Sequence, residues 1–476
     1  MKLKAIALIM MLAAMSSSLQ ARDITPQRTQ KAIDRFVDDS LMRHGSLGVI
    51  VVDVNNGKTL GVRNENMACI TASTMKTVTS SAALEMLGAE FTFQTPVYLE
   101  GEIQGNCLNG DIVIEGVGDP TLGSVYFKDN LDIVNEIVEF LKKQGIKEIY
   151  GKLRVDQSRY YYPAFNGDWC ADDLAWDFGM GVHALNYCDN RMRLVFDGNG
   201  DGTIDNAHFE PNVPGVQIIN RLRNENKDNV VPLLEYANPA IVLTGTARDT
   251  TYYFDVANPT PDALLLDSLV HSLARENIKV GNHNKIKGNQ RWLLFTHKSP
   301  VLTDIITSLL ERSDNMFTEA LLRAMAFNSG REPIDSEGVA VIDSLFTARG
   351  LDASGKFQYD GSGLARNNKA SVRFFADMLT YMATRRFGAK QLRLVDLMPR
   401  VGVNARIGTI IPETAISTHI AVKSGSMRDV QCYVGYYPAD NPQYAWAVLV
   451  NNWHGSRPNL RNMIDRLLIG IFDPEH

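Results

Sequence analysis

Ser73 and Lys76 form the only Ser-x-x-Lys motif in this sequence, and their residue types suit nucleophilic catalysis. On a helix, a spacing of three residues places the hydroxyl and the ammonium on one face. Serine is a weak nucleophile by itself, and lysine becomes a base when burial or a neighbouring cation lowers its pKa. A helix start also offers a free backbone N–H to a developing oxyanion. The pair therefore predicts a serine nucleophile with a lysine as its general base.

Two further groups of polar residues, each unique in the chain, supply what such a nucleophile needs. Ser313 and Asn315 belong to the one Ser-Asp-Asn tripeptide. Its serine hydroxyl can relay a proton, and its amide can hold a substrate carbonyl or hydrogen-bond the lysine. Lys423, Ser424 and Gly425 follow at the end of an apolar segment. The charge and hydroxyl suit a substrate carboxylate, and the glycine lets the backbone come close to a ligand.

The elements that must position these groups come from both ends of the chain. A helix is predicted from Thr71, which can act as its N-cap, to Gly88, with Ser73 and Lys76 in its first turn. Apolar periodicity predicts strands at 47–54, 59–63, 419–424, 430–437 and 444–451, and helices at 29–44, 300–310, 316–327, 373–384 and 460–471. Two strands near the start and three near the end predict one mixed sheet.

The middle of the chain has a different texture, with short strands between turns rich in Gly, Asp and Asn. The pattern predicts strands at 97–103, 112–115 and 149–155, and a helix at 132–144. The stretch from Lys76 to Ser313 is far longer than the connections that link two walls of one cleft. We therefore expect a signal peptide at 1–21, a discontinuous catalytic domain at 22–90 and 288–476, and an insertion at 91–287 with two subdomains.

Composition excludes several classes of protein. With 476 residues, of which 45% are hydrophobic and 21% are charged, the chain is a globular protein of several folding units. Its net charge of -6 lacks the basic excess that binding to nucleic-acid phosphates requires, so we expect no nucleic-acid partner. Histidines and cysteines do not cluster at the spacing of a zinc site. We expect neither a metal nor an organic cofactor.

The N-terminus indicates export. Lys2 and Lys4 precede an apolar run at 5–15, and small residues follow up to Ala21, which is the order of a secretory signal peptide. The run is too short to span a bilayer, and no later segment is apolar enough to do so. We expect a periplasmic protein, with or without a loose association with the membrane.

Five cysteines are an odd number for an exported chain, so at least one is free or paired with another chain. Cys170 and Cys188 are close enough in sequence to bridge across one loop. The sequence leaves open whether they do so or whether most of the cysteines are buried and reduced.

Taken together, the three motifs resemble the signatures of penicillin-binding proteins and serine β-lactamases. The runs Gly-Val-Gly-Asp-Pro-Thr-Leu at 116–122 and Asp-Gly-Ser-Gly-Leu at 360–364 are similar to one branch of that group. That branch is the D-alanyl-D-alanine carboxypeptidase/endopeptidase family of class C penicillin-binding proteins, peptidase family S13. The resemblance covers essentially the whole mature chain. Ser424 stands where threonine is common, and this substitution keeps the hydroxyl.

The resemblance implies an α+β, multidomain transpeptidase-like fold, in which a mixed antiparallel sheet and a helical lobe carry a large α/β insertion. It implies hydrolysis of the bond between two D-alanines in peptidoglycan peptides, through an acyl-enzyme that β-lactams also form. Ser73 would attack, Lys76 would act as base, Ser313 would relay the proton and Asn315 would position the substrate. The implied binding groups are Lys423 and Ser424 for the carboxylate, Gly425 for close approach, and the N–H groups of Ser73 and Ser426 for the oxyanion.

The resemblance also gives a place to Asp173, because a carboxylate of the inserted domain near such a Trp/Asp run faces the amine end of the peptide side chain. Two other functions stay open at the level of sequence. A β-lactamase would turn penicillin over quickly, and a non-catalytic cell-wall-binding protein would keep the fold without releasing a product. The domain-sized insertion favours the S13 branch over the simple β-lactamases.

Overall fold

The computed structural model describes residues 24–473, except 129, 131, 161, 198–206, 236–238, 282–289, 404–413 and 415. The predicted signal peptide at 1–21 lies outside the described residues. Within the described part, no helix combines the length and the apolar character needed to cross a membrane.

A five-stranded antiparallel sheet unites the two ends of the chain, as the sequence predicts. Its strand order is β19-β20-β21-β1-β2. The strands are β1 (Ser46–Asp53), β2 (Thr59–Arg63), β19 (Ala421–Met427), β20 (Val430–Tyr437) and β21 (Tyr444–Asn451). β1 forms hydrogen bonds to β21 along its full length, so the N-terminal hairpin and the C-terminal strands share one register.

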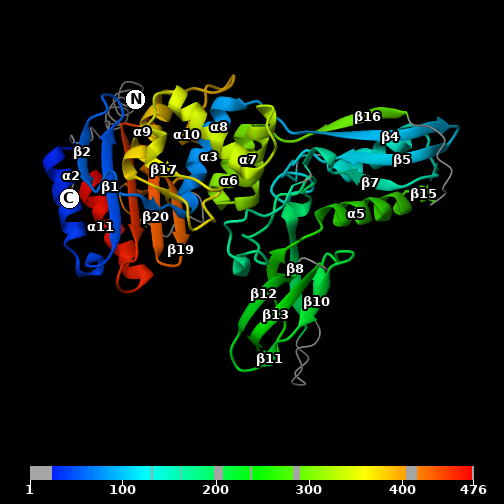
Figure 1. Ribbon diagram of the computed structural model, residues 1–476, viewed down its shortest axis with the longest axis horizontal. Coiled ribbons are helices and arrows are strands. Elements are labelled where there is room, and N and C mark those ends of the chain that lie inside the picture. The colour runs from blue at the N-terminus through cyan, green and yellow to red at the C-terminus, as the bar shows by residue number, and fades with distance from the viewer. Residues whose placement is uncertain are drawn as a thin grey trace, which may run out of the picture.

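Helices cover both faces of this sheet (Figure 1). Alternate residues of β1 take part in different cores: Val49 and Val51 pack towards α2 (Pro26–Val37) and α11 (Arg457–Phe472), whereas Ile50 and Val52 face a helical lobe. This is the period of two that a strand buried on both faces must show. The lobe contains α3 (Met75–Met86), α6 (Leu302–Arg312), α7 (Asn315–Asn328), α8 (Asp335–Ala348), α9 (Val372–Thr384) and α10 (Leu394–Leu397). Beside the lobe is a small sheet of β3 (Cys69–Ile70), β17 (Lys356–Phe357) and β18 (Lys369–Ala370).

The residues between α3 and α6 form a second body beside the helical lobe (Figure 1). The chain enters it along β4 and returns along the antiparallel neighbour β16. One sheet has the order β15-β6-β5-β4-β16, with β7 beside β5, and is covered by α4 (Ile133–Lys143) and α5 (Pro261–Arg275). Its strands are β4 (Gln94–Gln104), β5 (Cys107–Glu115), β6 (Glu148–Ile149), β7 (Leu153–Asp156), β15 (Lys279–Val280) and β16 (Arg291–Lys298).

Two smaller sheets complete this second body. The first has the order β14-β8-β9, and the second has the order β10-β13-β11, with β12 beside β13. Their strands are β8 (Arg191–Phe196), β9 (Ala207–Glu210), β10 (Gln217–Asn220), β11 (Arg223–Asn224), β12 (Asn229–Glu235), β13 (Ala240–Ala247) and β14 (Tyr252–Ala257). The fold class is therefore the predicted one, a mixed antiparallel sheet and a helical lobe with a large α/β insertion.

Four local predictions are wrong in detail. Thr71 makes no side-chain capping bond, and a short 3-10 helix, η2 (Ala72–Thr74), precedes α3. The first helix ends at Val37 instead of continuing to His44, because a 3-10 turn capped by Asp39 follows it. The predicted strand at 149–155 is split into β6 and β7. Lys423, Ser424 and Gly425 lie inside β19, since that strand continues to Met427.

The cysteines contain no disulfide. All five lie among the described residues, and each of them, Cys170 and Cys188 included, is free. This answers the question that the sequence leaves open.

Candidate active site

Ser73 and Lys76 meet at the start of α3, as the motif predicts. The Lys76 ammonium donates to Ser73 Oγ over 3.1 Å. Ser73 lies in η2 and is partly exposed, whereas the Lys76 side chain is fully buried. Ala72 has a left-handed backbone with φ 45°, which an alanine adopts only at a cost of about 1–3 kcal/mol. The tight turn presents the serine hydroxyl towards solvent while its lysine partner stays dry.

Lys76 donates to two further acceptors besides the serine. Asn315 Oδ1 is 2.5 Å away and the Ser362 carbonyl oxygen is 2.7 Å away. Burial lowers the pKa of Lys76 to about 8, although carboxylates including Asp360 and Glu319 act in the opposite direction. The pKa of Lys76 thus lies close to the value that a general base needs near neutral pH.

Two buried carboxylates hold the loop that faces Lys76. Glu319, on α7, accepts hydrogen bonds from the backbone N–H groups of Gly361 and Ser362, each over 2.7 Å. Burial and the Asp360 charge raise the pKa of Glu319 well above its ordinary value. Burial also raises the pKa of Asp360, but hydrogen-bond donors to its oxygens oppose that shift. The donors are the Gly363 and Ala365 N–H groups, the Asn368 amide and the Trp169 indole.

Ser313 and Asn315 lie at the junction of α6 and α7. Ser313 ends α6 in a left-handed conformation with φ 60°, and the Asp314 side chain caps α7. Asn315 is the first residue of α7, so its amide reaches Lys76 on one side and donates to the Phe178 carbonyl oxygen over 2.7 Å on the other. The connection between the two predicted helices is therefore a sharp turn that places the Asn315 side chain against Lys76.

Lys423 joins the same cluster from the sheet. Its ammonium donates to Ser313 Oγ over 2.8 Å and to the Ser424 carbonyl oxygen over 2.8 Å. The side chain is buried, and burial together with the positive charge of Lys76 lowers its pKa well below the ordinary value. An approaching carboxylate would act in the opposite direction and favour the charged form.

Gly425 brings β19 against the turn that carries the serine. A Cβ atom at this position would lie 2.6 Å from the Thr71 carbonyl oxygen and 3.0 Å from the Ser73 amide nitrogen. No side chain fits there without moving the backbone, which explains the glycine. Ser424 is partly exposed and Ser426 is exposed on the same strand. The structure thus brings all three motifs into one cluster.

Asp173 is not part of that cluster. It lies in a 3-10 helix, η4 (Ala171–Asp173), of the insertion and is half-buried. Burial raises its pKa, and the charge of Arg366 opposes the shift. Since Arg366 follows the 360–364 run by two residues, Asp173 faces the loop whose Ser362 carbonyl holds Lys76.

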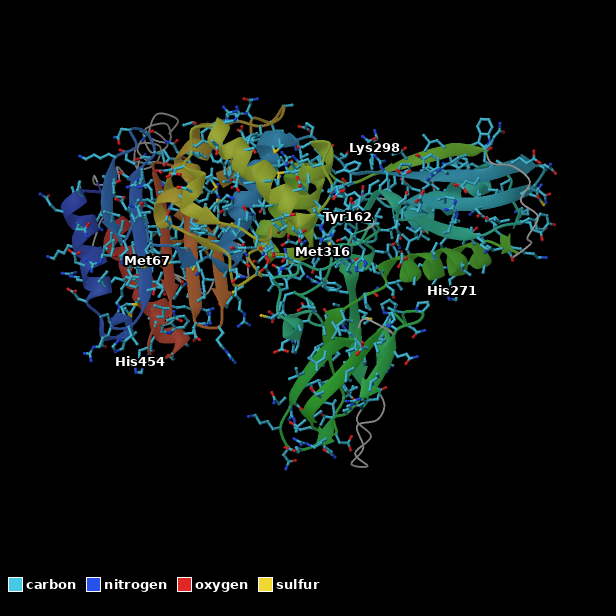
Figure 2. All side chains as sticks on the ribbon, viewed as in Figure 1. Met67, Tyr162, His271, Lys298, Met316 and His454 are labelled. Atoms are coloured by element: carbon cyan, nitrogen blue, oxygen red, sulfur yellow. The ribbon has the colours of Figure 1, made fainter. Side chains whose placement is uncertain are left out.

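Sequence reasoning missed how the insertion supports the site. The segment at 163–182 docks on the helical lobe through polar contacts to buried groups, near the labelled Tyr162 and Met316 (Figure 2). The contacts are Trp169 Nε1 to Asp360, Asn166 to Asp335, Asn315 to the Phe178 oxygen, and Arg323 to the Val182 and Pro163 oxygens. Neither spacing nor periodicity distinguishes these residues from ordinary loop residues.

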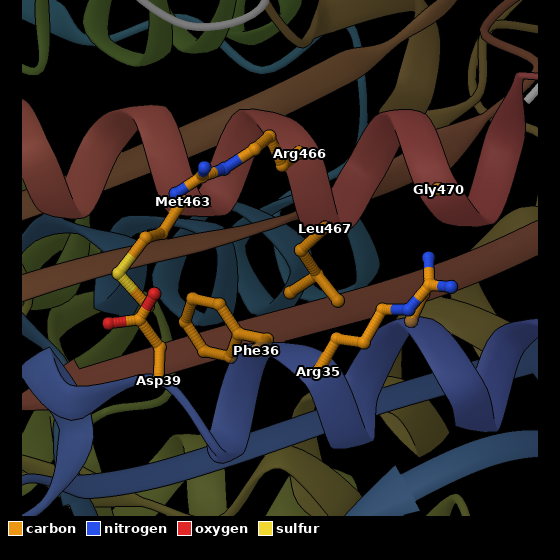
Figure 3. A pocket seen from close by; sticks show the side chains of 8 residues that line it. Arg35, Phe36, Asp39, Met463, Arg466, Leu467 and Gly470 are labelled. Atoms are coloured by element: carbon orange, nitrogen blue, oxygen red, sulfur yellow. The ribbon is translucent and has the colours of Figure 1, made fainter.

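We also searched for a metal site and for a pocket on the far face of the sheet. Among the described residues, no group of histidines, cysteines and carboxylates could hold a metal ion. A pocket of about 290 Å³ between α2 and α11, on the far face of the sheet, is lined by residues such as Arg35, Phe36 and Arg466 (Figure 3). Neither observation adds a residue to the cluster around Ser73.

Comparison with known proteins decides the family. The sequence matches the D-Ala-D-Ala carboxypeptidase 3 (S13) family over residues 29–469. The protein belongs to the S13 family. The family that the motifs indicate is thereby confirmed, and the S13 protein is a hydrolase.

Relatives match along nearly the whole chain. The D-alanyl-D-alanine carboxypeptidase DacB of Haemophilus influenzae is 26% identical over 424 residues, which are 86% of this chain and 86% of the relative. The D-alanyl-D-alanine carboxypeptidase of Actinomadura sp. is 24% identical and covers 90% of this chain and 81% of its own length. Penicillin binding protein 4 from Haemophilus influenzae has a TM-score of 0.75 at 24% identity, with 92% of this chain and 98% of that chain covered. This last likeness establishes the fold.

Replacing Trp169 by phenylalanine tests the docking of the insertion in the S13 protein. An aromatic ring is kept, although a smaller one, and Asp360 loses the indole donor, which lies 2.9 Å away. A hydrogen bond to a charged group is worth about 1.5–3 kcal/mol, so we expect a lower urea midpoint of unfolding. Trp292→Phe is the matched control, because Trp292 is 53% exposed. Equal midpoints for the two variants would contradict the role of Trp169.

Proposed function

We propose that this protein is a serine-type D-Ala-D-Ala carboxypeptidase that acts on peptidoglycan stem peptides through an acyl-enzyme on Ser73. The observation that carries the proposal is the contact of 3.1 Å between Ser73 Oγ and a fully buried Lys76 whose pKa burial lowers to about 8. Membership of the S13 family supplies the reaction class.

Acylation begins with the attack of Ser73 Oγ on the carbonyl carbon between the two D-alanines. Lys76, in its neutral form, takes the hydroxyl proton as the C–O bond forms. The backbone N–H groups of Ser73 and Ser426 stabilise the oxyanion. The close approach of β19 to the Ser73 amide, which Gly425 allows, supports this pairing.

Collapse of the tetrahedral intermediate breaks the C–N bond and needs a proton on the leaving amine. Ser313 Oγ relays to the amine the proton that Lys76 took from Ser73, so Lys76 becomes neutral again, and the Lys423 ammonium, which donates to Ser313 Oγ over 2.8 Å, favours the transfer. D-Alanine leaves, and water then attacks the Ser73 ester with Lys76 as base once more. The Asn315 amide positions the substrate carbonyl, while its oxygen orients Lys76.

The remaining residues select the substrate. Lys423 and Ser424 bind the terminal carboxylate, because one brings charge and the other a donor. Asp173 binds the amine end of the peptide side chain from the insertion. Its half-buried carboxylate near Arg366 supports a polar contact at that edge. No step requires a metal or an organic cofactor.

Domain division and location belong to the same proposal. The catalytic domain comprises 22–90 and the C-terminal part of the chain, and the inserted region begins at about residue 91. Because β16 pairs with β4, the inserted region extends beyond the expected limit of 287 to the end of β16 at Lys298. A signal peptide at 1–21 directs the protein to the periplasm, where its peptidoglycan substrate is found.

β-Lactams imitate the same dipeptide, since their strained amide and carboxylate match the scissile bond and the terminus. The Haemophilus influenzae penicillin binding protein 4 has been crystallised in complex with a β-lactam. Cleavage of peptide crosslinks is a second activity of the same site, because the attacked carbonyl is again that of a D-alanine. β-Lactamase activity and a non-catalytic role are outcomes of the experiment that follows.

Incubation with penicillin, followed over time by intact mass, tests the proposed function. We expect one stable adduct per chain, mapped to Ser73, and release of D-alanine from a pentapeptide that ends in D-Ala-D-Ala. Ser73→Ala should lose both, and Lys76→Gln should slow acylation by about 100-fold or more, the usual contribution of a general base. Ser80→Ala, a buried serine of the same helix, is the control. Rapid loss of the adduct would indicate a β-lactamase, and a folded protein without adduct or product would contradict the proposal.

The pH dependence of acylation tests the role of Lys76. Because Lys76 accepts a proton only when it is neutral, acylation should slow by about tenfold per pH unit below its pKa and level off above it. With a pKa of about 8, the rate should rise between about pH 6 and pH 8 and be flat above about pH 9. Stopped-flow acylation by a chromogenic cephalosporin measures this profile. A rate independent of pH from 6 to 9 would assign the base to another group.

A further inference from the structure

Arg457, in the first turn of α11, reaches across the sheet edge to the end of β19. Its guanidinium donates to Ser426 Oγ, to Gln431 Oε1 over 2.9 Å and to the Val430 carbonyl oxygen over 3.2 Å. A fourth contact goes to the Met427 carbonyl oxygen. The loop that leads into α11, where His454 is labelled, lies at this end of the sheet (Figure 2). Arg457 therefore connects the C-terminal helix to the strand that borders the nucleophile.

The contact with Ser426 fixes the direction of that hydroxyl. An Arg side chain has only donors, so Ser426 Oγ must accept from it and keep its own hydrogen for another partner. Ser426 Oγ itself donates to Gln431 Oε1 over 3.5 Å, at the limit of a hydrogen bond, and that oxygen also accepts from Arg457. Ser426 is exposed, so its hydrogen can turn from this long contact to a ligand. A hydroxyl that accepts from a cation is also a stronger donor.

The position of Ser426 indicates that this ligand group is a carboxylate. Ser424 and Ser426 are two residues apart on β19 and share one face of the strand. Ser424 belongs to the predicted carboxylate-binding motif, so the hydroxyl of Ser426 extends the same row of donors. The two hydroxyls match the two oxygens of a carboxylate.

The charges near the end of β19 also favour a carboxylate as the ligand group. Lys423 is buried, and burial and the charge of Lys76 both lower its pKa. An arginine stays protonated at all physiological pH values. Arg457 is partly exposed and thus brings a permanent positive charge to the Ser426 hydroxyl.

We infer that Arg457 is a positioning residue for the free carboxylate of the substrate: it orients the Ser426 hydroxyl towards that carboxylate and adds a permanent charge behind it. The inference rests on the proposed function. The preference for a substrate with a free C-terminal carboxylate then depends on Arg457, a residue that lies outside the three motifs.

The experiment compares two reactive thioester substrates that differ only in whether the leaving group ends in a carboxylate or a carboxamide. In Arg457→Met, kcat/KM should fall by about 10-fold or more for the carboxylate and by less than about 2-fold for the carboxamide, because the lost contact is charge-assisted. Arg457→Lys should recover part of the ratio between the kcat/KM for the carboxylate substrate and that for the carboxamide substrate. Arg466→Met, an exposed arginine of the same helix, should match the wild type.

A second comparison tests whether Arg457 acts through Ser426. In a Ser426→Ala background, Arg457→Met should have little further effect on the ratio, since contacts in one chain of hydrogen bonds are not additive. An equal loss on both thioesters, or a full additional effect without Ser426, would show a purely structural role and overturn the inference. Failure of the proposed function looks different: the wild-type protein would cleave neither thioester and take no penicillin.

Discussion

Lys76 is fully buried, and an ammonium group without water is stable only where protein acceptors surround it. The acceptors come from three separate places in the chain: Ser73 at the helix start, Asn315 at the start of α7, and the Ser362 carbonyl. Their arrangement requires α3, α7 and the loop after α8 to meet at one point. Burial that lowers the lysine pKa and carboxylates that raise it leave a base suited to neutral pH.

The surroundings of Lys76 depend on the insertion as well as on the helical lobe. Asp360 and Glu319 hold the loop at 360–364, and Trp169 of the insertion supplies one of the donors to Asp360. The insertion also accepts from Asn315 through the Phe178 carbonyl oxygen. Residues far apart in sequence therefore share one buried network, in which removing a donor leaves a charged or polar group without a partner.

The sequence predicts the parts whose signals are local or unique. The strands at 430–437 and 444–451 follow from alternating and apolar runs, and Ser73, Lys76, Ser313, Asn315 and Lys423 are found because each motif occurs once. Thr71 fails as a cap because the tight turn at Ala72 replaces the usual helix start. Glu319, Trp169 and Arg457 act through partners more than 25 residues away, and periodicity carries no information about such contacts. Asp360 was visible only as part of a run that resembles the family.

The central claim is that Ser73 carries the acyl group while Lys76 moves the proton. Rapid-quench analysis of a D-Ala-D-Ala pentapeptide measures it most directly, because free D-alanine and the ester on Ser73 are quantified in the same samples. D-Alanine should appear in step with a Ser73 ester in the first turnover, and both should slow together in Lys76→Gln. Release of D-alanine without an ester on Ser73 would contradict the mechanism.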